Sequence, residues 1–254
     1  KNNKFFNQGD KNMEQTLIEY FDNSEINQKL LKLFESKWEA VNKVYDTLQE
    51  EEEWAVLHLA CIPPNYEKTK YKILIVGQEN NGYGYETEPK KSMLFTLDFQ
   101  NGRYYDNAPF FSFPYSFCAS INDCDNEKYS KKSYLAWVNL KEFSFETSSK
   151  KPLNEKAQNI IDNEYNILEE EIKIINPDIV LFLTGPKYDY HIEIEKQLKG
   201  VEFKTVENYG IRQFARVEHK SLPKNSFRIY HPVYLRRRSL ENNYLEKLKK
   251  ECGL

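Results

Sequence analysis

Short apolar runs recur along the chain, and they predict the strands of a buried sheet. The clearest runs span Tyr71–Val76, Leu135–Asn139 and Ile179–Leu183, and weaker ones lie near residues 201–206 and 227–230. A near-continuous apolar run is typical of a strand covered on both faces in a parallel sheet. Helical patterns separate several of these runs, so the sequence predicts a layered α/β fold with a mostly parallel sheet.

Apolar residues spaced three or four apart predict the helices. The helical segments are residues 24–48, with Ser24 as N-cap, about 154–175, a stretch that ends at Lys199, and 238–250. Proline disfavours the continuation of a helix, so Asn176-Pro177-Asp178 is expected to end the helix over about residues 154–175. Residues 83–130 are irregular, aromatic and rich in turn-forming residues, and we expect mostly loop there with short elements.

The length and composition favour one folded domain. A chain of 254 residues with 40% hydrophobic residues can bury a full core. No Gly/Ser-rich or Pro-rich linker divides it, so we expect a single domain over residues 1–254. Residues 1–70 would form a helical extension packed on a core of residues 71–240, with a C-terminal helix in residues 241–254. No apolar run approaches membrane-spanning length, so we expect a soluble, cytoplasmic protein with no membrane partner.

The cysteines and histidines show no metal-ligand spacing. The residues concerned are Cys61, Cys118, Cys124, Cys252, His58, His191, His219 and His231. Since no CxxC, HxxxH or HExxH pattern is present, we expect no metal and no cofactor, and free thiols in a reducing compartment.

The charge is unevenly distributed along the chain. The net charge is −3, yet the segment from Arg212 to Arg238 carries eight Lys and Arg residues against one acid, Glu218. Such asymmetry is the usual footprint of a polyanion-binding face. A solvated basic surface without a partner explains the same pattern equally well.

Polar motifs follow the predicted strands, where ligands of parallel α/β sheets bind. These motifs are GQENNGYG at Gly77–Gly84, WVNL at Trp137–Leu140, the end of NPDIVLFLTG at Asn176–Gly185, and HPVYL at His231–Leu235. Each motif alone is compatible with a turn or a helix cap. The first motif lacks the lysine and the spacing of a phosphate-binding loop.

Taken together and in this order, the motifs resemble those of the uracil-DNA glycosylase superfamily. Its members carry a first motif such as GQDPYHG, an asparagine that ends a later strand, and a histidine motif such as HPSPL. The similarity covers about residues 70–240. It implies a three-layer αβα sandwich with a central, mostly parallel four-stranded sheet, DNA as the partner, and no cofactor. It also implies hydrolysis of the N-glycosidic bond of a flipped base, and we expect a monomer.

The resemblance also implies roles for individual residues. His231 would donate a hydrogen bond to the base oxygen that gains negative charge, and Asn139 would read the edge of the base. Gln78 would belong to the base-binding site. Leu235 would fill the gap left by the flipped base, and the arginines at 236–238 (Arg236, Arg237 and Arg238) would bind flanking phosphates.

The first motif departs from the family pattern at three positions. Glu79 replaces the aspartate that positions water, and a displacement near 1 Å costs on the order of a hundredfold in rate. Asn80 replaces the proline and is an alternative residue for positioning water. Asn81 replaces the tyrosine that excludes a 5-methyl group, so a thymine-like base would be admitted. For the aromatic residue that stacks on the base, Phe95 is the nearest match, and Phe110, Phe111 and Phe113 compete with it.

Three interpretations therefore remain open from the sequence. The first is a DNA glycosylase acting on uracil or another modified base. The second is a binding module of the same fold with altered catalysis, which recognises damaged or foreign DNA. The third is an unrelated α/β protein whose strand-end polar residues are caps. The sequence favours the superfamily fold, and it weighs catalysis and binding about evenly.

Overall fold

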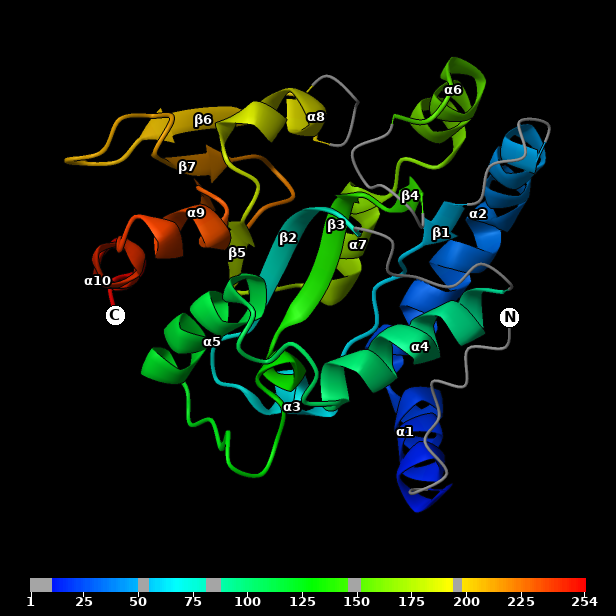
Figure 1. Ribbon diagram of the computed structural model, residues 1–254, viewed down its shortest axis with the longest axis horizontal. Coiled ribbons are helices and arrows are strands. Elements are labelled where there is room, and N and C mark those ends of the chain that lie inside the picture. Colours follow the sequence, from blue (N-terminus) through cyan, green and yellow to red (C-terminus); the bar gives the residue numbers. More distant parts are fainter. Residues whose placement is uncertain (1–10, 50–54, 81–87, 146–151, 194–197) are drawn as a thin grey trace.

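A six-stranded mixed sheet forms the centre of the computed structural model (Figure 1), which describes residues 11–49, 55–80, 88–145, 152–193 and 198–254. Its strands lie in the order β3-β2-β5-β8-β7-β6. Their bounds are β2 Ile73–Glu79, β3 Ala136–Lys141, β5 Ile179–Phe182, β6 Glu202–Thr205, β7 Phe214–Glu218 and β8 Asn225–Ile229. Strands β3, β2, β5 and β8 are parallel, whereas β7 and β6 continue the sheet in antiparallel pairing.

The α/β class and the mostly parallel sheet are as predicted, but the central sheet is larger than four strands. The sequence prediction missed β7, and it did not foresee that β6 and β7 join the sheet as an antiparallel extension beyond β8. The physical reason is exposure. Three of the four β6 residues are exposed, and β7 alternates only partly between buried and exposed positions, so neither strand produces the strong apolar run of a central strand.

A second, two-stranded sheet joins the N-terminal part of the chain to the end of β3. Strand β1 (Ala55–Leu57) pairs antiparallel with β4 (Phe143–Phe145), which follows β3 directly. The sequence prediction contained neither strand, because three residues are too few to show an alternating pattern.

The helices differ from the prediction in one region above all. The bounds are α1 Lys11–Asn23, α2 Glu25–Gln49, α3 Pro64–Lys68, α4 Pro89–Asn101, α5 Pro109–Ile121, α6 Glu155–Glu164, α7 Leu168–Ile175, α8 Asp189–Glu193, α9 Pro232–Arg237 and α10 Glu241–Cys252. Two helices of 13 residues, α4 and α5, occupy the region expected to be mostly loop. Helix α5 is apolar on nearly every side and contains Pro114, so it lacks the polar face on which helix prediction depends.

The long helix expected over residues 154–175 is instead two helices, α6 and α7. Tyr165 caps the end of α6, and its hydroxyl group points inward to donate a hydrogen bond of 2.6 Å to the Glu142 carboxylate. Helix α2 agrees closely with the prediction, and the predicted C-terminal helix is α10, which begins at Glu241.

Two apolar cores cover the two faces of the six-stranded sheet. Because strand side chains alternate between faces, Leu74 and Val138 pack with helices α1, α2, α4 and α7, whereas Ile75 and Trp137 pack with α5, α9 and α10. We call the second side the α5 face. In Figure 1, α5, α9 and α10 lie on the left and α1, α2 and α4 on the right. Among the described residues, no helix is both long and apolar enough to cross a membrane.

Two buried carboxyl groups lie in the first core, close to the end of β3. Burial raises the pKa of Glu142 to about 7, although the Tyr165 hydroxyl group donates to it. Burial, followed by the neighbouring charge of Glu142, raises the pKa of Glu171 well above its usual range. The folded protein therefore holds protons on this pair at pH values where the unfolded chain has released them.

This difference makes the stability of the fold depend on pH. A carboxyl group whose pKa is raised in the folded state stabilises the fold fully when the pH is below the pKa of the unfolded chain, near 4.5. This stabilisation is lost as the pH rises through the pKa of the folded state, which is about 7 for Glu142. We expect the free energy of unfolding to fall between pH 5 and pH 8, by up to about 1.4 kcal/mol per pH unit for each extra bound proton. The Glu171→Gln variant, which cannot ionise there, should lose less stability over this range. Urea unfolding of the wild type and of Glu171→Gln at several pH values measures the free energy of unfolding. If this free energy depended on pH equally in the two proteins, the prediction would be contradicted.

Candidate functional site

Three polar or small residues lie at the carboxyl ends of parallel strands and share the α5 face. Ile75, Trp137 and Ile229 all belong to the core on that face. Since alternate residues of a strand share a face, Gly77 and Asn139, each two residues further on, are directed the same way. Gly77 and Asn139 are also direct neighbours in the register of β2 and β3. His231 follows the end of β8, two residues after Ile229.

The Asn139 carboxamide is held in a fixed orientation. The Trp137 indole Nε1–H donates a hydrogen bond of 3.0 Å to Asn139 Oδ1. The carboxamide occupies space that Gly77 leaves open, because a Cβ atom at position 77 would lie 2.2 Å from that same oxygen. Asn139 is only 2% exposed, and its Nδ2 has no hydrogen-bond partner among the described residues. A buried, unsatisfied donor costs about 1–3 kcal/mol, so this group is suited to an acceptor on a ligand.

Phe110, in the first turn of α5, links Asn139 with His231. Its ring stacks on the His231 imidazole with the centroids 5.8 Å apart and an interplanar angle of 21°. Its Cζ atom lies 3.0 Å from the position that a Gly77 Cβ would take, next to the Asn139 oxygen. The imidazole at the end of β8 and the carboxamide at the end of β3 therefore border the same aromatic ring.

The other aromatic candidates lie elsewhere. Phe111 is buried behind this ring, edge-on to both Phe110 and Trp137. Phe113 is buried in the core on the α5 face, and Phe95 lies half-buried on α4, outside both cores. The geometry thus favours Phe110 as the stacking residue, in place of Phe95 or Phe111.

His231 is arranged as a neutral hydrogen-bond donor. It caps the N-terminus of α9, where its Nδ1 accepts a hydrogen bond of 3.3 Å from the backbone N–H of Val233. Burial lowers the pKa of His231 below its usual value. A neutral ring that accepts at Nδ1 carries its proton on Nε2, so His231 offers an N–H group to a ligand.

The two residues before Asn80 contact the segment that follows β5. Gln78 Nε2 donates a hydrogen bond of 2.7 Å to the Thr184 carbonyl oxygen, which ties β2 to the end of β5. The Tyr188 hydroxyl group, in the short 3-10 helix Pro186–Tyr188, donates to Glu79 Oε1 at 3.3 Å. Burial and the negative charge of Glu79 raise the pKa of Tyr188 to about 12. The half-buried Glu79 carboxylate is therefore oriented by a phenol that keeps its proton.

Asn80 has a structural role, which counts against the alternative that it positions water. Its Nδ2 donates to the carbonyl oxygens of Val56, at 3.1 Å, and Glu142, at 2.8 Å. These two bonds attach the β1–β4 sheet to the end of β2, so both amide hydrogens are engaged. Asn81, expected to admit a 5-methyl group, lies outside the described residues.

The leucine expected to fill the gap in DNA is a core residue. Leu235 is 0% exposed and packs in the core on the α5 face. Leu235 has the expected spacing from His231 along the chain. Helix α9, which begins at Pro232, directs the Leu235 side chain inward. Tyr234, its neighbour, is 42% exposed. In this structure the Leu235 side chain does not reach the surface, and Tyr234 is the exposed side chain beside it.

The arginines that follow have different roles. Arg236 anchors α9 to the start of α5 through hydrogen bonds to Ser112 Oγ, at 2.7 Å, and to the Asn107 carbonyl oxygen, at 2.9 Å. It also pairs with Glu241. Arg237 is exposed, and the exposed Arg238 lies over the Tyr234 ring, 5.8 Å from its centroid. The last two are thus better placed than Arg236 to contact phosphates.

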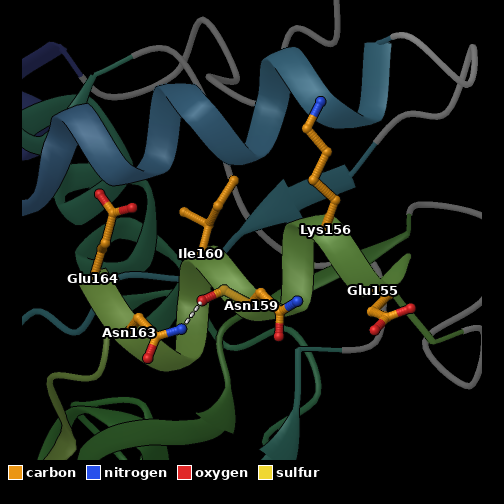
Figure 2. Close-up of a pocket in the computed structure, with 6 residues that line it drawn as sticks. All are labelled: Glu155, Lys156, Asn159, Ile160, Asn163 and Glu164. Atoms are coloured by element: carbon orange, nitrogen blue, oxygen red, sulfur yellow. Dashed lines mark hydrogen bonds between the residues drawn. The ribbon is translucent and has the colours of Figure 1, made fainter.

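A separate pocket lies along α6, next to α2 (Figure 2). Its lining residues are Glu155, Lys156, Asn159, Ile160, Asn163 and Glu164. They come from one helix and include none of the strand-end residues. Within the described parts of the chain, no three His, Cys, Asp or Glu side chains are grouped so as to hold a metal ion.

Comparisons with protein-family models, curated proteins and solved structures give no match for this chain. The function must therefore be inferred from the residues at the strand ends.

Two residues of this site escaped the sequence analysis. Trp137 orients Asn139, and Tyr188 orients Glu79. The two-residue spacing of Trp137 and Asn139 signals that they share a face of β3. No local pattern connects Tyr188 with Glu79, which are 109 residues apart.

The close approach of β2 to Asn139 makes Gly77 sensitive to substitution. In Gly77→Ala, the added methyl group would displace the Asn139 carboxamide and break its bond to Trp137. We expect the free energy of unfolding to fall by about 1–3 kcal/mol, and the NMR signal of the Trp137 indole N–H to shift. Gly210→Ala is the matched control, since its Cβ would have no contact shorter than 3.6 Å. Equal effects of the two substitutions would contradict the prediction.

Proposed function

We propose that this protein binds a base flipped out of DNA at the carboxyl ends of β2, β3 and β8, and hydrolyses its N-glycosidic bond in the manner of a uracil-DNA glycosylase. The observation that carries the proposal is the buried, unpartnered Nδ2 of Asn139, beside the Phe110 ring on which His231 stacks. A buried donor of this kind needs a hydrogen-bond acceptor, and a carbonyl oxygen of the bound base would supply one.

The polar groups match a pyrimidine with two carbonyl oxygens. Asn139 Nδ2 would donate to one base oxygen and His231 Nε2 to another. Asn139 Oδ1, which has a second lone pair beside the bond from Trp137, would accept the base N–H. Uracil presents this acceptor-donor-acceptor pattern. A base with an amino group at the Asn139 position would leave buried donors facing each other, which binding disfavours.

Phe110 provides the stacking surface. Flipping a base costs a few kcal/mol of lost stacking and pairing, and an aromatic side chain in the pocket recovers part of it. The ring contacts Trp137 edge to face and stacks on His231, with centroid distances of 5.9 and 5.8 Å. A ring fixed in this way loses little side-chain freedom when the base binds.

Two groups would stabilise the transition state. Breaking the N-glycosidic bond develops positive charge on the sugar and negative charge on the departing base. The Glu79 carboxylate, oriented by Tyr188, would stabilise the sugar cation and orient the attacking water. The neutral His231 would donate its Nε2–H to the base oxygen as negative charge gathers there.

The parallel strands support the same assignment. In chain order, β2, β3 and β8 carry Glu79, Asn139 and His231 to one edge of the sheet, with β5 between β2 and β8. This is the order of motifs on which the resemblance to the superfamily rests.

A binding module without catalysis is the second candidate, and the Glu79 environment favours it. Glutamate is one methylene longer than the family's aspartate, and its carboxylate already accepts a hydrogen bond from Tyr188. Asn80 cannot take over the positioning of water, because its two donors bind Val56 and Glu142.

The exposed surface beyond the site suits a nucleic-acid backbone. Tyr234 and Arg237 are exposed on α9, which begins directly after His231, and Arg238, which caps the end of this helix, is exposed as well. In this proposal Tyr234 occupies the gap left by the flipped base, since Leu235 is buried. Its ring can stack on the bases that flank the gap.

Measurements of base cleavage and of DNA binding distinguish the glycosylase from the binding module. Oligonucleotides that carry uracil, thymine opposite guanine, or other altered bases are incubated with the protein and then treated with alkali, which cuts abasic sites. We expect cleavage at uracil. Glu79→Gln should abolish it without loss of binding, and His231→Ala should reduce the rate by about 10²–10³, which is typical of losing one transition-state donor.

The outcomes discriminate in a definite way. Binding that depends on Asn139, without cleavage of any base, would favour the binding module. Equal losses of cleavage and affinity in His231→Ala would remove its catalytic role. No binding to any oligonucleotide would reject both candidates. Asn163→Ala, on the exposed side of α6, is the control and should change neither activity.

The DNA-facing surface is tested by salt dependence. Replacing Arg237 and Arg238 together with alanine should lower the slope of log affinity against log salt concentration by about two, because each arginine releases about one counterion. Replacing Lys29 and Lys32, exposed on α2 at the other side of the molecule in Figure 1, should leave the slope unchanged. An unaltered slope in the arginine variant would place the DNA elsewhere.

A further inference from the structure

Two thiols lie close together at the end of α5, away from the strand-end site. Cys118 is in the last turn of α5, and Cys124 follows in the segment after the helix. Their Sγ atoms are 3.8 Å apart, and both thiols are free. A disulfide needs the sulfur atoms at about 2.05 Å. Rotation of the Cys118 and Cys124 side chains has to bring the two sulfur atoms this much closer together.

The segments that carry these cysteines are held in place by other contacts. The Tyr134 hydroxyl group accepts a hydrogen bond from the Asp125 N–H, at 3.0 Å, and donates one to the Asp125 carbonyl oxygen, at 3.1 Å. On the other side, Asn122 bonds both backbone groups of Tyr71, just before β2, and its Nδ2 lies 3.4 Å from Cys118 Sγ. The two thiols are thus kept next to each other by the fold.

We propose that Cys118 and Cys124 form a redox pair, which a peroxide converts into a reversible intramolecular disulfide. The proposal rests on their separation, on the contacts that fix it, and on the different exposure of the two thiols. It is independent of the function proposed for the strand ends.

The two cysteines are suited to different steps. Cys124 is partly exposed, so an oxidant can reach it, whereas Cys118 is buried. The hydrogen bond between the two thiols lowers the pKa of Cys124, and the same bond, together with burial, raises the pKa of Cys118. The thiolate is the reactive form. Cys124 is therefore the attacking residue and Cys118 the resolving one.

The reaction balances with a peroxide as the oxidant. The Cys124 thiolate attacks one peroxide oxygen, the O–O bond breaks, and Cys124 becomes a sulfenic acid as water leaves. The Cys118 sulfur then loses its proton and attacks Cys124 Sγ, the S–O bond breaks, and a second water leaves. Two thiols and hydrogen peroxide thus give one disulfide and two water molecules. A thiol reductant reverses the change.

The disulfide would join the C-terminal end of α5 to the segment before Tyr134. Helix α5 carries Phe110 at its other end, and Ser112 in its first turns binds Arg236 of α9. The bond also protects Cys124 from further, irreversible oxidation.

The test uses the full-length protein and hydrogen peroxide. After a short exposure of the protein to hydrogen peroxide, free thiols are alkylated. The mass of the tryptic peptide 104–128, which contains both Cys118 and Cys124, is then measured by mass spectrometry. We expect this peptide to lose two hydrogens and to escape alkylation, and to regain both thiols with dithiothreitol. In Cys118→Ser, Cys124 should be trapped as a sulfenic acid by dimedone. In Cys124→Ser, Cys118 should stay reduced.

Cys252→Ser is the matched control and should form the disulfide like the wild type. Cys252 is also partly exposed, but burial raises its pKa to about 12, so it should react at least about tenfold more slowly than Cys124. Three results in the wild type would overturn the proposal. They are oxidation of Cys252 as fast as Cys124, a sulfinic acid at Cys124 while Cys118 still alkylates, and a disulfide between two chains.

Discussion

The site depends on one hydrogen bond, from the Trp137 indole to the Asn139 carboxamide, formed in the space that Gly77 leaves open. Both partners lie on β3, two residues apart, so they share one face of the strand and point toward α5 only while β3 keeps that face on this side. The pairing of β3 with β2 sets that face, and a slip of one residue would turn Asn139 into the opposite core. The apolar alternation that stabilises the sheet is therefore also what aims the carboxamide.

The sequence predicted those parts of the molecule that follow from strand periodicity. The central strands, the layered α/β class and the polar strand ends were found in this way, and residues 77, 139 and 231 share a side because each follows a core residue by two. Helix α5 was missed because its sequence is apolar on most sides, and β7 because it lies near the edge of the sheet and is partly exposed. Motif spacing could not predict that Leu235 is buried, for a different reason. Position in a motif gives distance along the chain, but the direction of a side chain depends on the helix that packs there.

The number of Lys and Arg residues between Arg212 and Arg238 overstates how many positive charges are free to bind a polyanion. Arg228 is buried in a two-pronged ion pair with Asp189, and Arg216 pairs with Glu251 across to α10. Arg236 is bound to α5 and Glu241. Breaking a buried pair such as Arg228–Asp189 costs about 3–5 kcal/mol, so Arg228 stabilises the fold and is not available to a polyanion. The sequence shows the number of charges, whereas the fold determines how they are engaged. Arg236, Arg237 and Arg238 are all exposed directly after the histidine motif, but Arg236 is paired with Glu241 and bonded to Ser112 of α5.

The orientation of Asn139 also bears on which base the site would accept. Because Oδ1 faces the Trp137 N–H, the carboxamide cannot flip without placing two N–H groups against each other. Nδ2 is therefore left as the donor without a partner among the described residues, and a neutral His231 presents a second donor. A buried donor left without an acceptor costs about 1–3 kcal/mol, which corresponds to roughly 5-fold to 150-fold in affinity for each mismatch. In the proposed function, a preference for bases that carry carbonyl oxygens would thus originate in Trp137, which orients the Asn139 carboxamide from within the core.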